Sequence, residues 1–461
     1  MKLLDLPTSE LLDKIGAGNH KPGSGSAAAL NSILSCKLIL TVTELTLDKV
    51  RYKETHAECK KIQDHIRNKI GPELEYLFQE DSEQFDKTIN KRTERNLAAN
   101  QKLKNQLDKE SLKELVESTE LPIRIAKLSL KLAKYSLYIF DNCFKSARGD
   151  SGVALNSSLA GITGCISIVS LNLSSFPKNI WTEKIKRERN EIRKEYTKMT
   201  EENFKRMDTL EAEAERKNEL YAQINSIKSR LKGQLFLSNN DLEKLATDLQ
   251  NTLWTFRDLI WKTNQPTNPV GVLKPEKVIR LLKYAYREVV TMGVEGIGID
   301  EIAGQIDNNT DTITISKMYP KEVKNFTTAH EMAHALLHED LILHRDIPLD
   351  RPIESYNRPI KEKQADKLAA YFLLPEKRVR DIFKYIFKVD RIVVNEQSAY
   401  AIANCSLIEL KKRLKNRRQL SRYIAKSSFF NLTPHNPIHA IFNVSVEAMA
   451  IRLEELNLVQ Y

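Results

Sequence analysis

The sequence has few cysteines, and they form no recognisable pattern. Among 461 residues there are five, with no closely spaced pair: Cys36, Cys59, Cys143, Cys165 and Cys405. A disulfide framework or a thiolate zinc site would need paired cysteines, so the sequence argues against both. We expect reduced cysteines that fill space in the interior.

The sequence also lacks a segment suited to secretion or membrane insertion. Residues 1–7, Met-Lys-Leu-Leu-Asp-Leu-Pro, contain no apolar core for a signal peptide. The run from Ser151 to Pro177 has no charged residue, but its many Asn, Ser and Thr make it too polar for a membrane span. We interpret this run as a buried helix and predict a cytoplasmic protein without membrane contact.

Basic residues exceed acidic ones, 72 against 61, which gives a formal net charge of +11. This excess favours a nucleic acid or an acidic partner without establishing either. A basic run extends from Lys411 to Arg418 and continues to Lys426. It is either the solvated face of a helix or a surface for nucleic acid, and the sequence leaves both open.

Residues up to about 176 have helical patterns and few Gly or Pro, with one exception. Pro22-Gly23-Ser24-Gly25-Ser26 leads directly into an Ala-rich helix, whose free amides could hold an anion. Because Gly-Lys-Ser/Thr is missing, this is not a Walker loop. The alternative is a turn that lets two helices pack closely.

Three short patterns in order make residues 1–178 similar to the cyclodeaminase/cyclohydrolase family of folate enzymes. The patterns are Pro22-Gly-Ser-Gly-Ser26, Glu80-Asp81 before Phe85, and Asp150-Ser-Gly-Val-Ala154, and Asn172 matches a late Asn of the family. The resemblance implies an all-helical, usually dimeric fold. It also implies a pocket for a small anionic ligand at these positions: Pro22, Gly23, Ser24, Gly25, Ser26, Asp81 and Asp150. The family's Leu-Pro-Lys after Phe85 is absent here, and its Ser-Asp pair is replaced by Gly149-Asp150. The resemblance therefore supports the family's fold more strongly than its folate-converting activity.

Residues 179–235 are rich in Glu, Lys and Arg and carry a thin apolar stripe. Spacings of three and four alternate along it, which predicts a coiled coil, either an antiparallel pair within one chain or the stalk of a homodimer. Farther on, Pro275 to Met292 has the pattern of an amphipathic helix.

The most specific pattern lies at residues 326–338, Phe-Thr-Thr-Ala-His-Glu-Met-Ala-His-Ala-Leu-Leu-His. On a helix, His330 and His334 share one face and can chelate one metal ion. Glu331 can take a proton from a water at that ion. Catalytic zinc sites need a third protein ligand, and the best candidate is Glu362 on a second helix. Asp366, one turn beyond, is placed to accept a hydrogen bond from a ligand histidine.

These segments resemble the ImmA/IrrE family of metallopeptidases. The matching residues are Phe326 to His334, Glu362-Lys-Gln-Ala-Asp366, Leu373-Leu374-Pro375, and a closing segment, residues 441–459, with Val444-Ser445 and Arg452-Leu453. The resemblance implies a Zn²⁺-dependent endopeptidase with a protein substrate, commonly a helix-turn-helix repressor. A long insertion between Pro375 and the closing segment departs from the family pattern.

Two features around this site stay open. Residues 304–306 and 313–315 predict two strands around an Asn/Asp turn, so Thr312 to Ser316 is either a substrate-binding edge or only packs on the helix. The donor to the oxyanion is not identified by the sequence. The candidates are His435, His439, Tyr356 and Tyr371.

We therefore predict a mainly α protein with a small β-sheet, in three parts. Residues 1–178 form a helical bundle, 179–235 a coiled-coil connector, and 236–461 a zincin-like α+β metallopeptidase domain. The predicted function is a zinc-dependent endopeptidase, with a bundle that senses a small ligand. Two rival functions are a non-cleaving sensor or scaffold that binds a regulator or DNA, and a folate-type cyclohydrolase with an appended protease.

Overall fold

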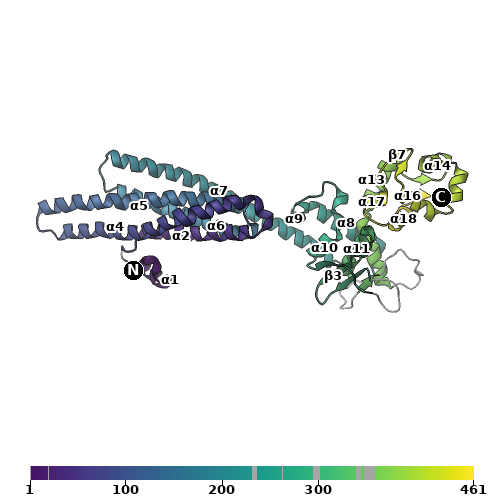
Figure 1. Cartoon of the computed structure of the whole chain (residues 1–461), viewed down its shortest axis with the longest axis horizontal. Coiled ribbons are helices and arrows are strands. Elements are labelled where there is room, and N and C mark those ends of the chain that lie inside the picture. The colour runs from purple at the N-terminus through teal and green to yellow at the C-terminus, as the bar shows by residue number, and fades with distance from the viewer. Residues whose placement is uncertain are drawn as a thin grey trace. The chain divides into compact units, whose positions relative to one another are not determined.

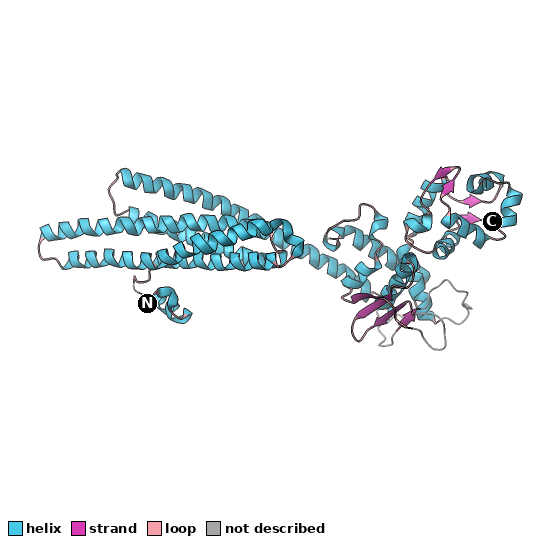
Figure 2. Ribbon diagram, viewed as in Figure 1, coloured by secondary structure: helices cyan, strands magenta, loops and turns pink. Residues whose placement is uncertain are grey.

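The computed structural model describes residues 2–18, 20–230, 236–261, 263–293, 302–338, 344–346 and 359–461 (Figures 1 and 2). These residues are mainly helical, and their strands form one four-stranded sheet and two two-stranded sheets. The chain divides into two compact units, residues 1–212 and 213–461. The predicted mainly α fold with an α+β C-terminal part is confirmed.

The first unit is a bundle of long helices. Helices α2, α4, α5 and α6 pack lengthwise on one another, and their apolar side chains form one core, as they must to leave water. The helices of this unit are α1 (Thr8–Gly16), α2 (Ser24–Leu47), α3 (His56–His65), α4 (Gly71–Leu97), α5 (Gln101–Asn142) and α6 (Arg148–Leu173), with short helical turns at Leu3–Asp5, Val50–Thr55, Ile66–Ile70 and Lys145–Ala147.

Two helical stretches of this bundle, Ser24–Leu47 and Lys145–Leu173, are long and apolar enough to cross a membrane. About half of each apolar window is buried inside the unit. Serine hydroxyls join the two helices, since Ser35 Oγ lies 2.7 Å from Ser158 Oγ. Both helices therefore contribute to the core of the bundle.

Helix α7 (Ile180–Ser229) is continuous and belongs to both units. Its apolar stripe is divided between two cores: Ile185, Ile192 and Met199 lie in the first, and Leu220, Ile224 and Ile227 lie in the second. Residues 211–219 between them are all exposed. The stripe that predicted a coiled coil is thus buried by the two cores rather than by a partner helix along its length.

The second unit contains a four-stranded sheet next to helix α11 (Lys321–Leu337). Its strands are β1 (Ala285–Val289), β2 (Gly304–Asp307), β3 (Thr312–Ser316) and β4 (His344–Asp346), in the order β1-β3-β2-β4. Strand β1 is parallel to β3, and the other pairs are antiparallel. Ile306, Ile313 and Ile315 are fully buried in the core that includes α11.

The structure corrects one expectation about this region and decides between the two alternatives for Thr312 to Ser316. The helix expected from Pro275 to Met292 ends early, because α10 covers only Pro275–Leu281 and Lys283 has a positive φ of 71°. The following residues form β1 instead. Since β1 covers one side of β3, the segment Thr312 to Ser316 lies inside the sheet and is not an edge. Among the described strands, β1 and β4 are the outer ones.

The second unit contains further helices and short strands. They are α8 (Asn239–Thr255), α9 (Arg257–Ile260), a helical turn at Pro269–Val272, α12 (Ile360–Leu373), α13 (Glu376–Phe387), β5 (Ile392–Val393), α14 (Glu396–Ala403), α15 (Leu407–Arg413), α16 (Arg417–Lys426), β6 (Phe429–Phe430), β7 (Thr433–Pro434), α17 (Ile438–Ile441), α18 (Val446–Glu455) and β8 (Val459–Gln460). The insertion after Pro375 is thus mostly short helices.

Candidate functional site

Two packed helices bring the predicted metal ligands together. Helix α11 carries His330 and His334 on one face, with ring centroids 4.7 Å apart, and both side chains are fully buried. Helix α12 packs against α11 and presents Glu362 from its first turn. His330, His334 and Glu362 each offer one donor atom, and these atoms lie within 4.8 Å of one another. We call these three residues the His–His–Glu cluster.

The donor atoms of the cluster converge closely. His330 Nε2 lies 3.0 Å from His334 Nε2 and 3.1 Å from Glu362 Oε2. His334 Nε2 lies 3.3 Å from Glu362 Oε1. Ligands at 2.0–2.1 Å in a tetrahedral zinc site stand about 3.3 Å apart. The cluster therefore has the spacing and the nitrogen and oxygen donors of a site that could hold one metal ion.

Asp366 orients one of the histidines. Its Oδ1 lies 2.9 Å from His330 Nδ1, on the side of the ring that faces away from the cluster. A carboxylate at Nδ1 keeps the proton on that nitrogen and leaves Nε2 free to bind a metal. The structure thus gives Asp366 the contact for which the sequence singled it out.

Glu331 is fully buried and lies against strand β2. A Cβ at Gly304 would stand 3.1 Å from Glu331 Oε1 and 2.6 Å from Thr327 Cγ2. Only glycine permits this close approach of the strand to α11. Gly304 also pairs with Asp346 of the outer strand β4. The carboxylate of Glu331 therefore lies against the residue of β2 that pairs with the outer strand β4.

The described oxyanion candidates have contacts outside the cluster. Tyr371 lies nine residues after Glu362 on α12, about 13 Å along the helix, and the Arg452 guanidinium covers its ring at 4.7 Å. His435 contacts Phe387, with ring centroids 5.6 Å apart. His439 Nδ1 lies 3.1 Å from the Val444 carbonyl oxygen. Tyr356 lies outside the described residues.

In the bundle, the glycine loop packs against an acidic side chain of its own chain. Asp81 on α4 lies where a Cβ of Gly25 would be, 2.1 Å from its Oδ1. Ser26 Oγ donates to the carbonyl of Phe78 and to Asp81 Oδ2, at 3.0 and 3.3 Å. Burial raises the pKa of Asp81 to about 6, although hydrogen bonds from Ser26 oppose the shift. The N-terminal turn of α2 therefore already holds an internal carboxyl group.

The structure brings only part of the predicted ligand pocket together. Helices α2 and α6 are antiparallel, because Gly161 lies against Ala28 and Ser32, whereas Ser158 meets Ser35. Asp150 lies eleven residues before Gly161, about 17 Å farther from the loop along α6. Within one chain, Asp150 is thus not part of a pocket with Pro22, Gly23, Ser24, Gly25, Ser26 and Asp81, because a continuous helix separates them.

Sequence reasoning missed three residues beside this loop. His20 Nε2 lies 2.8 Å from Asp86 Oδ1, and Lys21 Nζ lies 3.2 Å from Asp86 Oδ2. Hydrogen bonding from His20 lowers the pKa of Asp86. The only signal in the sequence is that Asp86 follows Phe85 of the acidic pattern.

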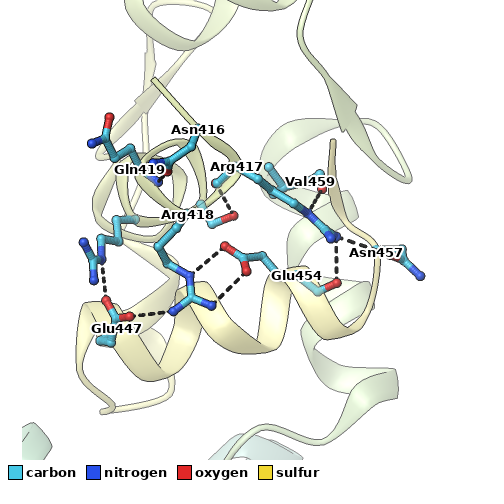
Figure 3. Close-up of polar contacts among 10 residues, drawn as sticks. Asn416, Arg417, Arg418, Gln419, Glu447, Glu454, Asn457 and Val459 are labelled. Atoms are coloured by element: carbon cyan, nitrogen blue, oxygen red, sulfur yellow. Dashed lines mark hydrogen bonds and ion pairs between the residues drawn. The ribbon is translucent and has the colours of Figure 1, made fainter. Parts of the chain in front are cut away.

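The basic run of α16 has a structural role in this unit. Figure 3 shows the Arg418 guanidinium between two carboxylates of α18, 2.7 Å from Glu447 and 2.8 Å from Glu454. Arg422 also bonds to Glu447. Arg417 donates to the carbonyl oxygens of Val459 and Glu454, at 2.8 and 2.7 Å. These arginines hold α16 to the closing segment.

Comparisons with known proteins divide the chain in the same way. Residues 7–191 match the family model described as "Formiminotransferase-cyclodeaminase", and residues 295–396 match a peptidase family described as "IrrE N-terminal-like domain". The chain is 23% identical over 177 residues to a methenyltetrahydrofolate cyclohydrolase of Methylorubrum extorquens, which covers 37% of this chain and 81% of that protein.

Among solved structures, a formiminotetrahydrofolate cyclodeaminase of Thermotoga maritima matches with a TM-score of 0.40 and 17% identity, over 45% of this chain and 98% of that one. By the two family models, the chain combines an N-terminal domain of the cyclodeaminase/cyclohydrolase type with a C-terminal IrrE-like domain of a peptidase family.

Proposed function

We propose that the second unit is a zinc-dependent endopeptidase that cleaves a protein substrate. The observation that carries this proposal is the His–His–Glu cluster, whose donor atoms lie within 4.8 Å of one another, together with the buried carboxylate of Glu331, the residue that follows His330. Two imidazoles and one carboxylate form a ligand set that catalytic zinc sites use. The match of residues 295–396 to a peptidase family supports the same reaction class.

His330, His334 and Glu362 would hold the ion. When bound, zinc supplies a Lewis acid that polarises the scissile carbonyl and makes a nearby water more acidic. Glu331 accepts the proton of the attacking water and then donates it to the leaving amine. The burial of Glu331 beneath β2 fixes its position, so little reorganisation is needed before proton transfer.

The outer edge of β4 supports a polypeptide as the substrate. Strand β4 pairs with β2 at Gly304, the residue that lies against Glu331. An extended peptide can add to an outer strand through backbone hydrogen bonds alone. We therefore assign substrate binding to β4 in place of β3, and a repressor with an accessible extended segment is the proposed class of target.

Replacement of Glu331 by Gln tests this function. The variant should keep the metal, because Glu331 is not in the cluster, but lose proteolysis by at least about 100-fold, since the general base is gone. The measurement is a comparison of new protein N-termini in cells that express the wild type or Glu331→Gln. Glu322→Gln, in the first turn of the same helix, is the control and should cleave normally. Equal sets of new N-termini from the wild type and Glu331→Gln would rule out the proposed role.

For the bundle, we propose a binding site for a small anionic ligand, with folate-type cyclohydrolase activity as the rival function. The similarity to a methenyltetrahydrofolate cyclohydrolase and the grouping of Lys21, His20 and Asp86 beside the glycine loop support a ligand site. A thermal-shift comparison of folates and nucleotides on the full chain tests it. Stabilisation by a folate without its turnover would favour a sensor over an enzyme.

A further inference from the structure

His338 is joined to His334 through both backbone and side chain. Helix α11 ends at Leu337, and His338 follows in an extended conformation with φ −125° and ψ 128°. Its backbone N–H donates to the His334 carbonyl at 3.0 Å. Its ring Nδ1 lies 2.9 Å from His334 Nδ1, and the side chain is largely buried. The end of the helix thus turns a third imidazole toward the second ligand histidine.

The position of the cluster decides which nitrogen of His334 carries the proton. A neutral imidazole has one N–H and one acceptor nitrogen. The Nε2 of His334 faces His330 Nε2 and Glu362, so this nitrogen is the one that binds a metal. The proton must then be on Nδ1, from which it is donated to His338 Nδ1. His338 therefore accepts at Nδ1 and carries its own proton on Nε2.

His338 cannot itself be a further ligand of the same ion. It contacts the Nδ1 side of the His334 ring, whereas the donor atoms of the cluster converge on the Nε2 side. Its contact is equivalent to that of Asp366 with His330. The two ligand histidines thus differ, because one has a carboxylate as its partner and the other a neutral imidazole.

We propose that His338 is a positioning residue that fixes the tautomer and ring orientation of His334 for metal binding. The inference rests on the proposed zinc site and adds a residue to it. Outer partners of ligand histidines typically change metal affinity by 10–100-fold. Because its partner atom is an imidazole nitrogen, His338 orients His334 without adding a second carboxylate around the cluster.

The test is the zinc affinity of the full chain, measured by competition with a chromophoric chelator, for the wild type and three variants. His338→Leu fills the space without an acceptor and should bind zinc about 10–100-fold more weakly. His338→Asn places its Oδ1 where Nδ1 was and should stay within a few fold of the wild type. His338→Gln carries its amide one bond farther out and should resemble His338→Leu.

Two further readouts separate positioning from mere packing. Without metal, the His338→Leu chain should unfold at the same denaturant concentration as the metal-free wild type. When loaded with cobalt(II), it should show an absorption spectrum that differs from that of the cobalt-loaded wild type. If His338→Leu binds zinc as tightly as the wild type, or if His338→Asn is as weak as His338→Gln, the inference is overturned while the zinc site stands. If the wild type itself binds no zinc, the proposed function fails and the inference fails with it.

Discussion

At the scale of single residues, the two units use carboxyl groups in different ways. Asp366 and Glu362 each lie next to an imidazole, which gives the carboxylate a partner. Asp81 instead lies in the bundle core against the backbone of Gly25, with hydrogen bonds from Ser26. Buried acids with a raised pKa are typical of functional sites, and Asp81 is such an acid next to the glycine loop that was predicted to bind a ligand.

Asp81 should make the stability of the bundle depend on pH. Its folded-state pKa of about 6 lies above the usual value near 3.9. Between these values the folded state holds more protons than the unfolded chain, so the contribution of Asp81 to stability is present below pH 4 and is lost as the pH rises to 6. Asp81→Asn stays uncharged. Relative to the wild type, it should gain roughly 3 kcal/mol in free energy of unfolding between pH 4 and pH 7.

Denaturant unfolding of the full chain at a series of pH values measures this difference. The amide oxygen of Asp81→Asn can still accept the hydrogen bond that Ser26 Oγ donates to Asp81. Asp64→Asn on α3 is the control and should show no such trend. A constant difference between Asp81→Asn and the wild type from pH 4 to pH 7 would contradict the account.

At the scale of elements, Arg452 joins three helices of the second unit. This buried side chain on α18 donates to the Leu374 carbonyl at 3.1 Å and to Glu243 of α8 at 2.6 Å, and it covers the ring of Tyr371 on α12. Arginine is suited to this position because its planar group can stack and form several hydrogen bonds at once. Through α12, Arg452 supports the helix that carries Glu362.

Loss of Arg452 should therefore weaken the second unit. We expect Arg452→Met to lower its free energy of unfolding by about 2–4 kcal/mol, because a buried carbonyl oxygen and Glu243 lose their partner. Arg452→Lys should give an intermediate loss, since lysine keeps the charge but cannot make all these contacts. Arg378→Met, at an exposed ion pair on α13, is the control and should change stability by less than about 0.5 kcal/mol. Equal stability of all three variants would contradict this role.

The elements that carry the cluster could be predicted from sequence because their information is local. The spacing of His330 and His334 defines the inner face of α11, and the apolar stripe of α12 defines the face of that helix that must be buried. The packing of these two faces on each other could therefore be predicted. The strand β1 could not be predicted in this way. Its residues continue the apolar spacing of α10. The helix ends and the strand begins because Lys283 has a positive φ and because β1 pairs with β3.

Errors at this scale spread to the interpretation of neighbouring elements. Because β1 was expected to be helical, its pairing with β3 could not be foreseen, and a substrate-binding edge remained one of two alternatives for β3. Asp150 was grouped with the glycine loop by the order of patterns, but order along a chain does not show how far apart two ends of a long helix lie. Hydrogen bonds between distant residues, such as His20 with Asp86, leave no periodic signal.

At the scale of the whole molecule, α7 is the only element that contributes to both cores of the described residues. Its middle residues, 211–219, are all exposed, and Arg216 among them bonds to the Thr255 carbonyl oxygen and to Asp258 at the surface. Exposed ion pairs of this kind contribute little to stability. The two units should therefore keep their stability when this part of the helix is broken.

Ala214→Pro tests this independence. Proline in a helix interior costs about 3 kcal/mol locally, but at residue 214 it disrupts only backbone near exposed positions. The unfolding transitions of both units and the zinc affinity should stay within error of the wild type. Ala246→Pro, in the buried part of α8, is the control and should destabilise the second unit strongly. Loss of either unit in Ala214→Pro would show that α7 stabilises it through its middle.

The central claim is that one ion is held jointly by side chains from α11 and α12, and its most direct test is the zinc content per full-length chain. The account predicts one tightly bound zinc ion in the wild type and in Glu331→Gln, and none in Glu362→Leu or in the double variant His330→Ala/His334→Ala. A full complement of zinc in the double variant, or none in the wild type, would contradict it.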